Sequence, residues 1–428
     1  MRRRRIIIAF MQHPQATSGV PLIGIKAESG KLFPWYRIHA LGVFATAITT
    51  NAVYFFARYE LHQGLRVRLA MAASSAMVYC IAALIGGRLV DRLGQRRVGA
   101  WAVAALTLVF IFGAWAVWRR SLGMLFAFLP LMNMCTGPLW PSIESALTRT
   151  HGKIALSMRM TLYNLNWSST GFVAACVAGV LAKTLSWAGL FLLAAGIGCV
   201  LWILMVRIAI PPKAGDIALH EDPNQKKAHD LPLLNSPRSR KLLHMAWLSN
   251  MLAFVAANTV TPFMPTITLS LGIKSYVLAT ALASIASLAV IVGFLITTLW
   301  TGWHYRIRWT LIPFVALVAG AVAMLLSQSL MMFVCAQLLY GVGLAMQYSG
   351  SIYYSMHLSA GAAEKAGVHE GLIGLGATLG PGLIAVAGAP NAIVPKAMAL
   401  LVVLCVGGGA LGFMASRPEM PKPTGADG

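Results

Sequence analysis

The chain has 428 residues, of which 58% are hydrophobic and 11% are charged, and its formal net charge is +22. Soluble domains carry roughly 25% charged residues, so this composition excludes an ordinary soluble protein and indicates one that resides in a lipid bilayer. The basic residues lie in the gaps between apolar runs and do not form a separate basic domain. We therefore interpret the charge as a signal of membrane topology and predict no nucleic-acid partner.

Twelve apolar segments follow one another along the chain. Each is close to the ~20 residues that an α-helix needs to cross the hydrocarbon core of a membrane. The sequence therefore predicts an all-α polytopic membrane protein with twelve transmembrane helices. The predicted spans are residues 35–58, 67–90, 98–118, 121–147, 156–182, 188–209, 243–270, 275–300, 309–327, 330–357, 367–388 and 394–416.

The gap between the sixth and seventh spans is longer than the others, polar, and charged with both signs. It divides the spans into two sets of similar length, which predicts two pseudo-symmetric six-helix bundles. The predicted organisation is a tail over residues 1–34, a bundle over 35–209, a linker over 210–242, a second bundle over 243–416, and a tail over 417–428.

The Lys and Arg residues fall unevenly on the two sides of the predicted membrane. When both termini are placed inside, 26 of the 34 basic residues lie on the inner side and 8 on the outer side. Positively charged loops stay in the cytoplasm, so we predict a plasma (inner) membrane protein with both termini cytoplasmic. The apolar stretch from Ile6 to Met11 is too short for a signal-peptide core. We therefore expect a cytoplasmic N-terminal tail, with Met11 as an alternative start.

The loop between the second and third spans carries one acid, Asp91, among four arginines in the stretch from Gly87 to Arg97. Its spacing, Gly-x-Leu-x-Asp-Arg-x-Gly-x-Arg-Arg, resembles the loop between helices 2 and 3 of the major facilitator superfamily, in particular transporters of bacterial type. The motif also stands at the matching place in a twelve-span topology. The resemblance covers residues 35–416.

This resemblance implies a gate on the cytoplasmic side. In that family the acid of the loop packs against the cytoplasmic end of helix 11 and helps to lock the inner gate. Helix 11 would begin at that side, so its free N–H groups and positive dipole end suit a carboxylate. We expect the glycines to allow close approach and the arginines to hold the loop at the lipid headgroups. The predicted gating motif consists of Gly87, Leu89, Asp91, Arg92, Gly94, Arg96 and Arg97.

The fourth span departs from the proton-driven members of that family, which often carry an arginine in mid-helix. Here no Lys or Arg occurs between Arg120 and Arg149. Two acids near the inner ends of helices 4 and 11 offer another route, because neighbouring carboxyl groups tend to share a proton. We hypothesise a proton-sensitive inner-gate cluster around Asp91; the alternative is that its members are ordinary helix caps and surface ion pairs. The other members are Glu144, Arg149, Arg159, His357, His369 and Glu370.

Polar residues inside a membrane are costly and therefore tend to face a cavity or one another. The family architecture places helices 1, 4, 7 and 10 around a central cavity, and helix 5 adds further polar residues. Together they predict a polar, aromatic and essentially uncharged lining, which suits a neutral or amphiphilic small organic solute better than a phosphate or a dicarboxylate. The candidate lining residues are Thr50, Asn51, Tyr54, Asn133, Trp140, Tyr163, Asn164, Trp167, Asn258, Gln347, Tyr348, Tyr353 and Tyr354.

The sequence thus predicts a secondary active transporter of a small organic solute, working by rocker-switch alternating access, with proton coupling as a hypothesis. Two alternatives stay open: a polytopic membrane enzyme acting on lipid, and a non-transporting sensor or scaffold of transporter-like fold. The adjacent pair His369 and Glu370 lacks partners at metal-ligand spacing. We therefore predict no enzymatic activity, no cofactor and no metal site. The expected partners are the solute, protons and the lipid bilayer, and the resemblance implies a monomer.

Overall fold

The computed structural model describes residues 22–149, 156–209, 237–358 and 363–417, which form long helices joined by short turns. The elements are α2 (Leu22–Tyr59), α3 (Leu65–Leu93), α4 (Gln95–Trp118), α5 (Leu122–Arg149), α6 (Leu156–Arg207), α9 (Pro237–Ser270), α10 (Tyr276–Ala283), α11 (Ile285–Leu299), the short 3₁₀ helix η1 (Thr301–Trp303), α12 (Arg308–Leu325), α13 (Leu330–His357), α14 (Ala363–Val386) and α15 (Ile393–Ser416).

The helices have the length and surface of membrane spans. Within the described residues, ten segments are long and apolar enough to cross a bilayer. One of them, α6, contains two legs, and α14 adds a further 24-residue helix, so the helices make the twelve crossings that hydropathy predicts. Large apolar side chains such as Leu108, Val406 and Phe413 are exposed on the outside of the bundle. An outward apolar surface of this kind requires a lipid environment.

Some boundaries differ from the predicted ones. Helix α2 begins at Leu22 and α9 at Pro237, so both extend into stretches that we expected to be tail and linker. Helical hydrogen bonds can continue beyond the apolar span, and hydropathy therefore marks the membrane and not the end of the helix. The fifth and sixth spans are joined by a sharp kink at Ser186 (φ 68°, ψ 165°). The eighth span is interrupted at Ser284, between α10 and α11.

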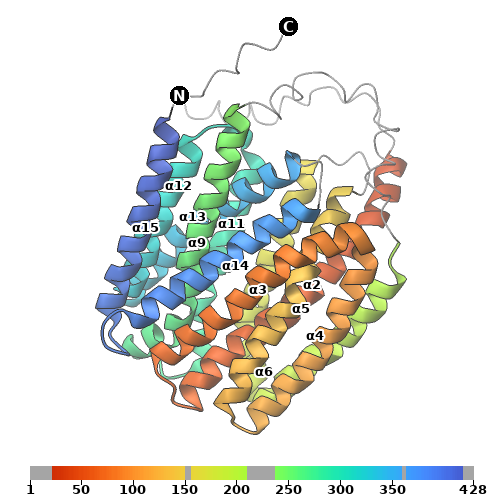
Figure 1. The fold of residues 1–428 in the computed structure, drawn as a ribbon. Coiled ribbons are helices and arrows are strands. Elements are labelled where there is room, and N and C mark those ends of the chain that lie inside the picture. The colour runs from red at the N-terminus through yellow and green to blue at the C-terminus, as the bar shows by residue number, and fades with distance from the viewer. Residues whose placement is uncertain (1–21, 150–155, 210–236, 359–362, 418–428) are drawn as a thin grey trace, which may run out of the picture.

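The helices form two groups that lie side by side, α2–α6 and α9–α15 (Figure 1). Helix α14, drawn in blue, runs diagonally across the boundary along the full face of α3, and this is the most extensive contact between any two elements. A second contact joins α6 to α10 and α11. We name the two ends of the molecule after residues of α3: the Arg66 end, where α3 begins, and the Asp91 end, where it stops.

Glycines allow α3 and α14 to approach closely. A Cβ atom placed on Gly87 would lie 2.6 Å from the carbonyl oxygen of Ala363, and one placed on Gly374 would lie 2.6 Å from the backbone of Cys80. Real side chains do not tolerate such distances, so only glycine fits at these two points. The helix pair therefore packs backbone against backbone, as small residues permit in membrane proteins.

Candidate functional site: a cavity between the helix groups

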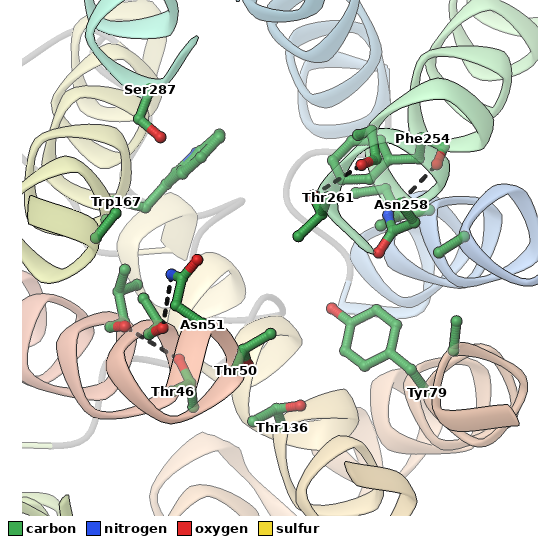
Figure 2. Close-up of a pocket in the computed structure, with 18 of the residues that line it drawn as sticks. Thr46, Thr50, Asn51, Tyr79, Thr136, Trp167, Phe254, Asn258, Thr261 and Ser287 are labelled. Atoms are coloured by element: carbon green, nitrogen blue, oxygen red, sulfur yellow. Dashed lines mark hydrogen bonds between the residues drawn. The ribbon is translucent and has the colours of Figure 1, made fainter. Parts of the chain in front are cut away.

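A cavity of about 500 Å³ lies between the two helix groups. Its wall takes side chains from α2, α3, α5 and α6 on one side and from α9, α10, α11, α13 and α14 on the other. Figure 2 shows Thr46 and Asn51 of α2 facing Asn258 and Thr261 of α9 from opposite sides. Both helix groups therefore contribute to the wall of the cavity.

Nine of the thirteen residues that we expected to line a cavity are in its wall. They contribute amide, hydroxyl and aromatic groups from α2, α5, α6, α9 and α13, and none carries a charge. The nine are Thr50, Asn51, Tyr54, Asn133, Trp140, Tyr163, Trp167, Asn258 and Tyr348.

The other four candidates lie elsewhere, which corrects their expected position. Asn164 is buried on α6 outside the cavity wall. Gln347 points away, donating from Nε2 to the carbonyl oxygen of Thr310 at 2.9 Å and so joining α13 to α12. Tyr353 and Tyr354 lie one to two turns further along α13, where they join an aromatic cluster with Trp303. Spacing along α13 could not reveal these directions, because polar residues occur on all its faces.

Several further residues complete the wall. His39, Thr46, Thr136, Thr261 and Ser287 line the cavity, as does Tyr79 of α3. Helix 2 was not expected to take part, because the family architecture assigns the cavity to other helices. The signal that could have identified Tyr79 is its position as the polar aromatic residue in the middle of an apolar span.

Two buried carboxyl groups meet at one side of the cavity. Glu144 of α5 and Glu370 of α14 are 0% and 4% exposed, and their carboxyl groups lie near one another. Tyr163 donates its hydroxyl to Oε1 of Glu144 at 2.8 Å, and Tyr79 donates to Oε2 of Glu370. Neither carboxyl forms an ion pair with any described residue. The pair joins the two helix groups, since α5 belongs to one and α14 to the other.

Asp91 occupies the junction of three helices at the end named after it. Its Oδ1 accepts a hydrogen bond from Arg149 of α5 at 2.5 Å, and its Oδ2 accepts one from the backbone N–H of Glu364 in the first turn of α14 at 2.9 Å. A carboxylate at this position satisfies a free N–H group and faces the positive end of the helix dipole. Of the remaining motif residues, Gly94 makes the turn between α3 and α4 with φ 89°, while Leu89, Arg92, Arg96 and Arg97 are exposed.

The expected inner-gate cluster is divided into separate groups. Arg149 contacts Asp91, whereas Arg159 donates to the carbonyl oxygens of Leu147 and Thr148 at 2.8 Å and so caps the end of α5. His369 is buried and its Nδ1 lies 2.8 Å from Oγ of Ser351.

His357 belongs to a different group, which corrects its expected place beside the acids. Its ring stacks on Tyr353 at 5.3 Å, and Tyr353 stacks in turn on His304 at 4.5 Å. Burial lowers the pKa of His304, and the nearby His357 lowers it further. His304 is therefore neutral at physiological pH, and the stack packs as an aromatic column.

The Arg66 end is closed by a separate set of polar contacts. Arg66 donates to the carbonyl oxygens of Ala385 and Gly388 at 3.1 and 3.0 Å, at the end of α14. The fully buried Arg68 donates to the carbonyl oxygen of Pro262 and to Oγ1 of Thr266, the latter at 2.6 Å. Both arginines therefore tie α3 to the opposite helix group.

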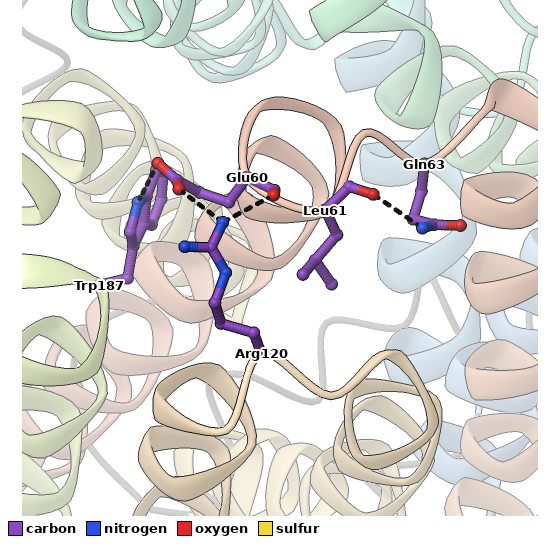
Figure 3. Close-up of polar contacts among 5 residues, drawn as sticks. All are labelled: Glu60, Leu61, Gln63, Arg120 and Trp187. Carbon is purple, nitrogen blue, oxygen red and sulfur yellow. Dashed lines mark hydrogen bonds and ion pairs between the residues drawn. The ribbon is translucent and has the colours of Figure 1, made fainter.

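Within the first helix group, Glu60 lies at the Arg66 end and accepts hydrogen bonds from two other segments of the chain (Figure 3). It accepts from Arg120 at 3.3 Å and from Nε1 of Trp187 at 3.2 Å, next to the Ser186 kink. These contacts lie away from the cavity wall. In the part of the chain that the structure describes, no group of His, Cys, Asp and Glu side chains is arranged to hold a metal ion.

Comparisons with known proteins agree on one family. The family model described as Major Facilitator Superfamily matches residues 39–385. A curated relative, "Probable anion transporter 3, chloroplastic" of Oryza sativa subsp. japonica, is 29% identical over 169 residues, which are 39% of this chain and 30% of that protein. Its namesake in Arabidopsis thaliana is 26% identical over 125 residues, 29% of this chain and 24% of that protein. The chain therefore matches less than a third of the length of either relative.

Solved structures share the fold. A bacterial homologue of the human lysosomal transporter Spinster, inward-facing and occupied, superposes with a TM-score of 0.65 at 14% identity, covering 92% of this chain and 99% of that one. The nucleoside transporter NupG (D323A mutant) gives 0.66 at 12% identity, covering 90% and 99%. With the family model matched over most of the chain and the same helical architecture in these transporters, the chain belongs to the Major Facilitator Superfamily and is an integral membrane transporter.

Proposed function

We propose that the protein is a secondary active transporter that moves a small organic solute by rocker-switch alternating access and is driven by protons. The observation that carries this proposal is the buried pair of carboxyl groups, Glu144 and Glu370, contributed by opposite helix groups at the cavity. The two groups of helices would rock about the cavity and expose it to one side of the membrane at a time.

The carboxyl pair can couple protons to this motion. Two ionised carboxylates in a buried site repel one another strongly, whereas one shared proton lets them form a hydrogen bond. The described residues supply no donor to Oε2 of Glu144 apart from such a proton. Protonation therefore favours contact between α5 and α14, and loss of the proton favours their separation. A proton gradient would bias the conformational equilibrium in this way.

The contacts of Asp91 would hold the two helix groups together at the Asp91 end. Separation of the helix groups at the Asp91 end requires Asp91 to leave the first turn of α14, whereas its contact with Arg149 lies within the first group. We assign this end to the cytoplasm, because positively charged loops are retained there. Both termini would then be cytoplasmic and the protein would reside in the plasma (inner) membrane. Arg92, Arg96 and Arg97 would contact lipid headgroups, and the protein would function as a monomer.

The name of the plant relatives raises anion transport as a second candidate. An anion needs cationic partners when it leaves water. Among the described residues of the cavity wall there is no Lys or Arg. We therefore favour an uncharged or cationic organic solute.

Transport in proteoliposomes tests the proposal. Purified protein is given a panel of neutral, cationic and anionic organic solutes with and without an imposed pH gradient. We expect accumulation of at least one solute that depends on the gradient. Glu144→Gln and Glu370→Gln should lose this dependence while still exchanging labelled for unlabelled solute. Glu60→Gln, which alters a carboxyl group remote from the cavity, serves as the matched control.

Two results would contradict the proposal. If both glutamine variants kept the wild-type dependence on the pH gradient, the carboxyl pair would not be the coupling site. If the wild-type protein neither accumulated nor exchanged any solute of the panel, transport itself would be in question and a sensor role would gain support.

A further inference from the structure

The wall of the cavity has a one-sided charge. Among the described residues that form it, Glu370 is the only acid, and no Lys or Arg contributes. Two arginines of α5 and α6 are engaged elsewhere: Arg149 with Asp91, and Arg159 with the end of α5. Any solute in the cavity therefore meets a field that is neutral or negative, which disfavours anions.

The polar groups of the wall also offer hydrogen-bond acceptors to a solute. Asn51 and Asn258 donate their Nδ2 groups to carbonyl oxygens one turn earlier in their own helices, at 2.9 and 3.3 Å, which leaves each amide oxygen available. Thr46, Ser75 and Thr261 likewise donate their hydroxyl hydrogens to their own helices, at 2.9 Å in each case. Their hydroxyl oxygens can still accept hydrogen bonds from a solute. These acceptors suit a solute that carries donors or a positive charge.

Aromatic rings complete the wall. The negative faces of such rings attract organic cations, and the attraction grows when the site is shielded from water. Rings also provide apolar area for the body of an amphiphilic solute. The rings of the wall are Phe55, Phe254, Tyr54, Tyr79, Trp140, Tyr163, Trp167, Tyr340 and Tyr348.

We propose that the cavity binds an organic ammonium ion and releases it in exchange for the proton held by Glu144 and Glu370. This rests on the proton-coupled transport proposed above. When the cation enters beside Glu370, one proton leaves the pair for water, and the charge of the site does not change. When a proton returns, the cation is displaced. Cation and proton thus compete for one site, and the protein is an exchanger.

Titratable groups of several helices face this site. They are Tyr79 of α3, Tyr163 of α6, Tyr348 of α13, His369 of α14, and His39 of α2, whose ring stacks on Tyr163 at 4.2 Å. The tyrosine hydroxyls stay neutral over the pH range in which carboxyl groups exchange protons. A carboxyl group becomes an anion when its proton leaves, whereas an imidazole or a phenol that titrates near or above neutral pH does not, so the carboxyl pair is the group at which the cation competes with a proton.

A set of three probes with the same ring and different charge tests this inference: benzyltrimethylammonium, benzyl alcohol and benzylsulfonate. Binding to the purified protein is measured by titration calorimetry between pH 5.5 and 8.5, in two buffers with different heats of ionisation. At high pH, benzyltrimethylammonium should bind about tenfold or more tightly than the other two, with release of close to one proton. Its affinity should fall by about tenfold for each unit of acidification, the slope of one-for-one competition.

Variants sharpen the test. Glu370→Gln should remove the preference for the cation and the release of the proton, whereas Glu60→Gln should retain both. If Glu370→Gln does not fold, the pH competition in the wild-type protein still decides. Equal or tighter binding of benzyl alcohol or benzylsulfonate would overturn the cation assignment, even where gradient-driven transport persists. Tight binding of the cation without proton release would instead contradict the proposed proton coupling and leave the substrate class standing.

Discussion

At the scale of single residues, the carboxyl pair depends on two tyrosines in different ways. Tyr163 donates to Glu144 within one helix group, whereas Tyr79 of α3 donates across the boundary to Glu370 of α14. A buried carboxyl oxygen without a donor costs free energy, because it has lost its water partners. Tyr79 therefore stabilises the contact between the groups as well as the acid itself.

Replacing Tyr79 by Phe tests this contribution. We expect Tyr79→Phe to lower the free energy of unfolding by about 1–3 kcal/mol, since the largely buried Glu370 loses a hydrogen-bond donor. The apparent Tm of the purified protein in detergent reports the change. Tyr340→Phe is the matched control, because Tyr340 also lines the cavity but does not donate to either carboxyl group of the pair. An equal loss in both variants would contradict a specific role for Tyr79.

For single residues, the sequence predicted which polar groups are present but only part of their placement. Acids are rare in this chain, so Glu144 and Glu370 could be brought together from their positions near the inner ends of their helices. The direction of each polar side chain could not be predicted, because it depends on the rotation of the helix about its axis. Gln347 and Tyr353 were misplaced for this reason, and Tyr79 was overlooked.

At the scale of elements, the contact between α3 and α14 depends on glycine at mid-helix. We predict that Gly374→Ala lowers the apparent Tm, because the new methyl group would overlap the backbone of Cys80 and force the helices apart, at a cost of about 1–3 kcal/mol. Gly409→Ala on α15 is the control, since a Cβ atom placed there would have no neighbouring atom within 4 Å. A Gly374→Ala protein as stable as the control would show that the helices can shift without loss.

The Asp91 contacts make a second prediction at this scale. Asp91→Asn and Arg149→Gln should each reduce the transport rate at equal amounts in the membrane, because each breaks the same ion pair at the 2.5 Å contact. The double variant should be no slower than either single one, with a coupling energy of about 1 kcal/mol or more. Unchanged transport by Asp91→Asn would exclude the gating role.

The elements themselves were largely predictable, for a physical reason. A bilayer imposes apolar segments of fixed length, so hydropathy locates each crossing. It does not locate helix ends that project beyond the bilayer, such as those at Leu22 and Pro237. Nor does it reveal the kink at Ser186, where two spans follow one another with almost no loop.

At the scale of the whole molecule, α3 holds α14 at both of its ends. Asp91 accepts from the N–H group of Glu364 at the start of α14, and Arg66 donates to two carbonyl oxygens at its end. Each charge has the sign that the helix dipole favours at that position. Because both ends are engaged in this structure, rocking transport requires each set of contacts to open in turn.

A reversible cross-link tests this requirement at the Arg66 side. A Cβ atom on Gly382 of α14 would lie 3.7 Å from Cβ of Ala73 of α3, within the ~3.5–4.5 Å found in disulfides. In the double variant Ala73→Cys with Gly382→Cys, an oxidant should join the helices and stop transport, and a reductant should restore it. Each single variant, which retains the six native cysteines, reports any effect of oxidation unrelated to the bridge. If the fully cross-linked protein transported solute at the uncross-linked rate, α3 and α14 would stay together throughout the cycle, and the solute would have to pass by a route that does not separate the two helix groups there.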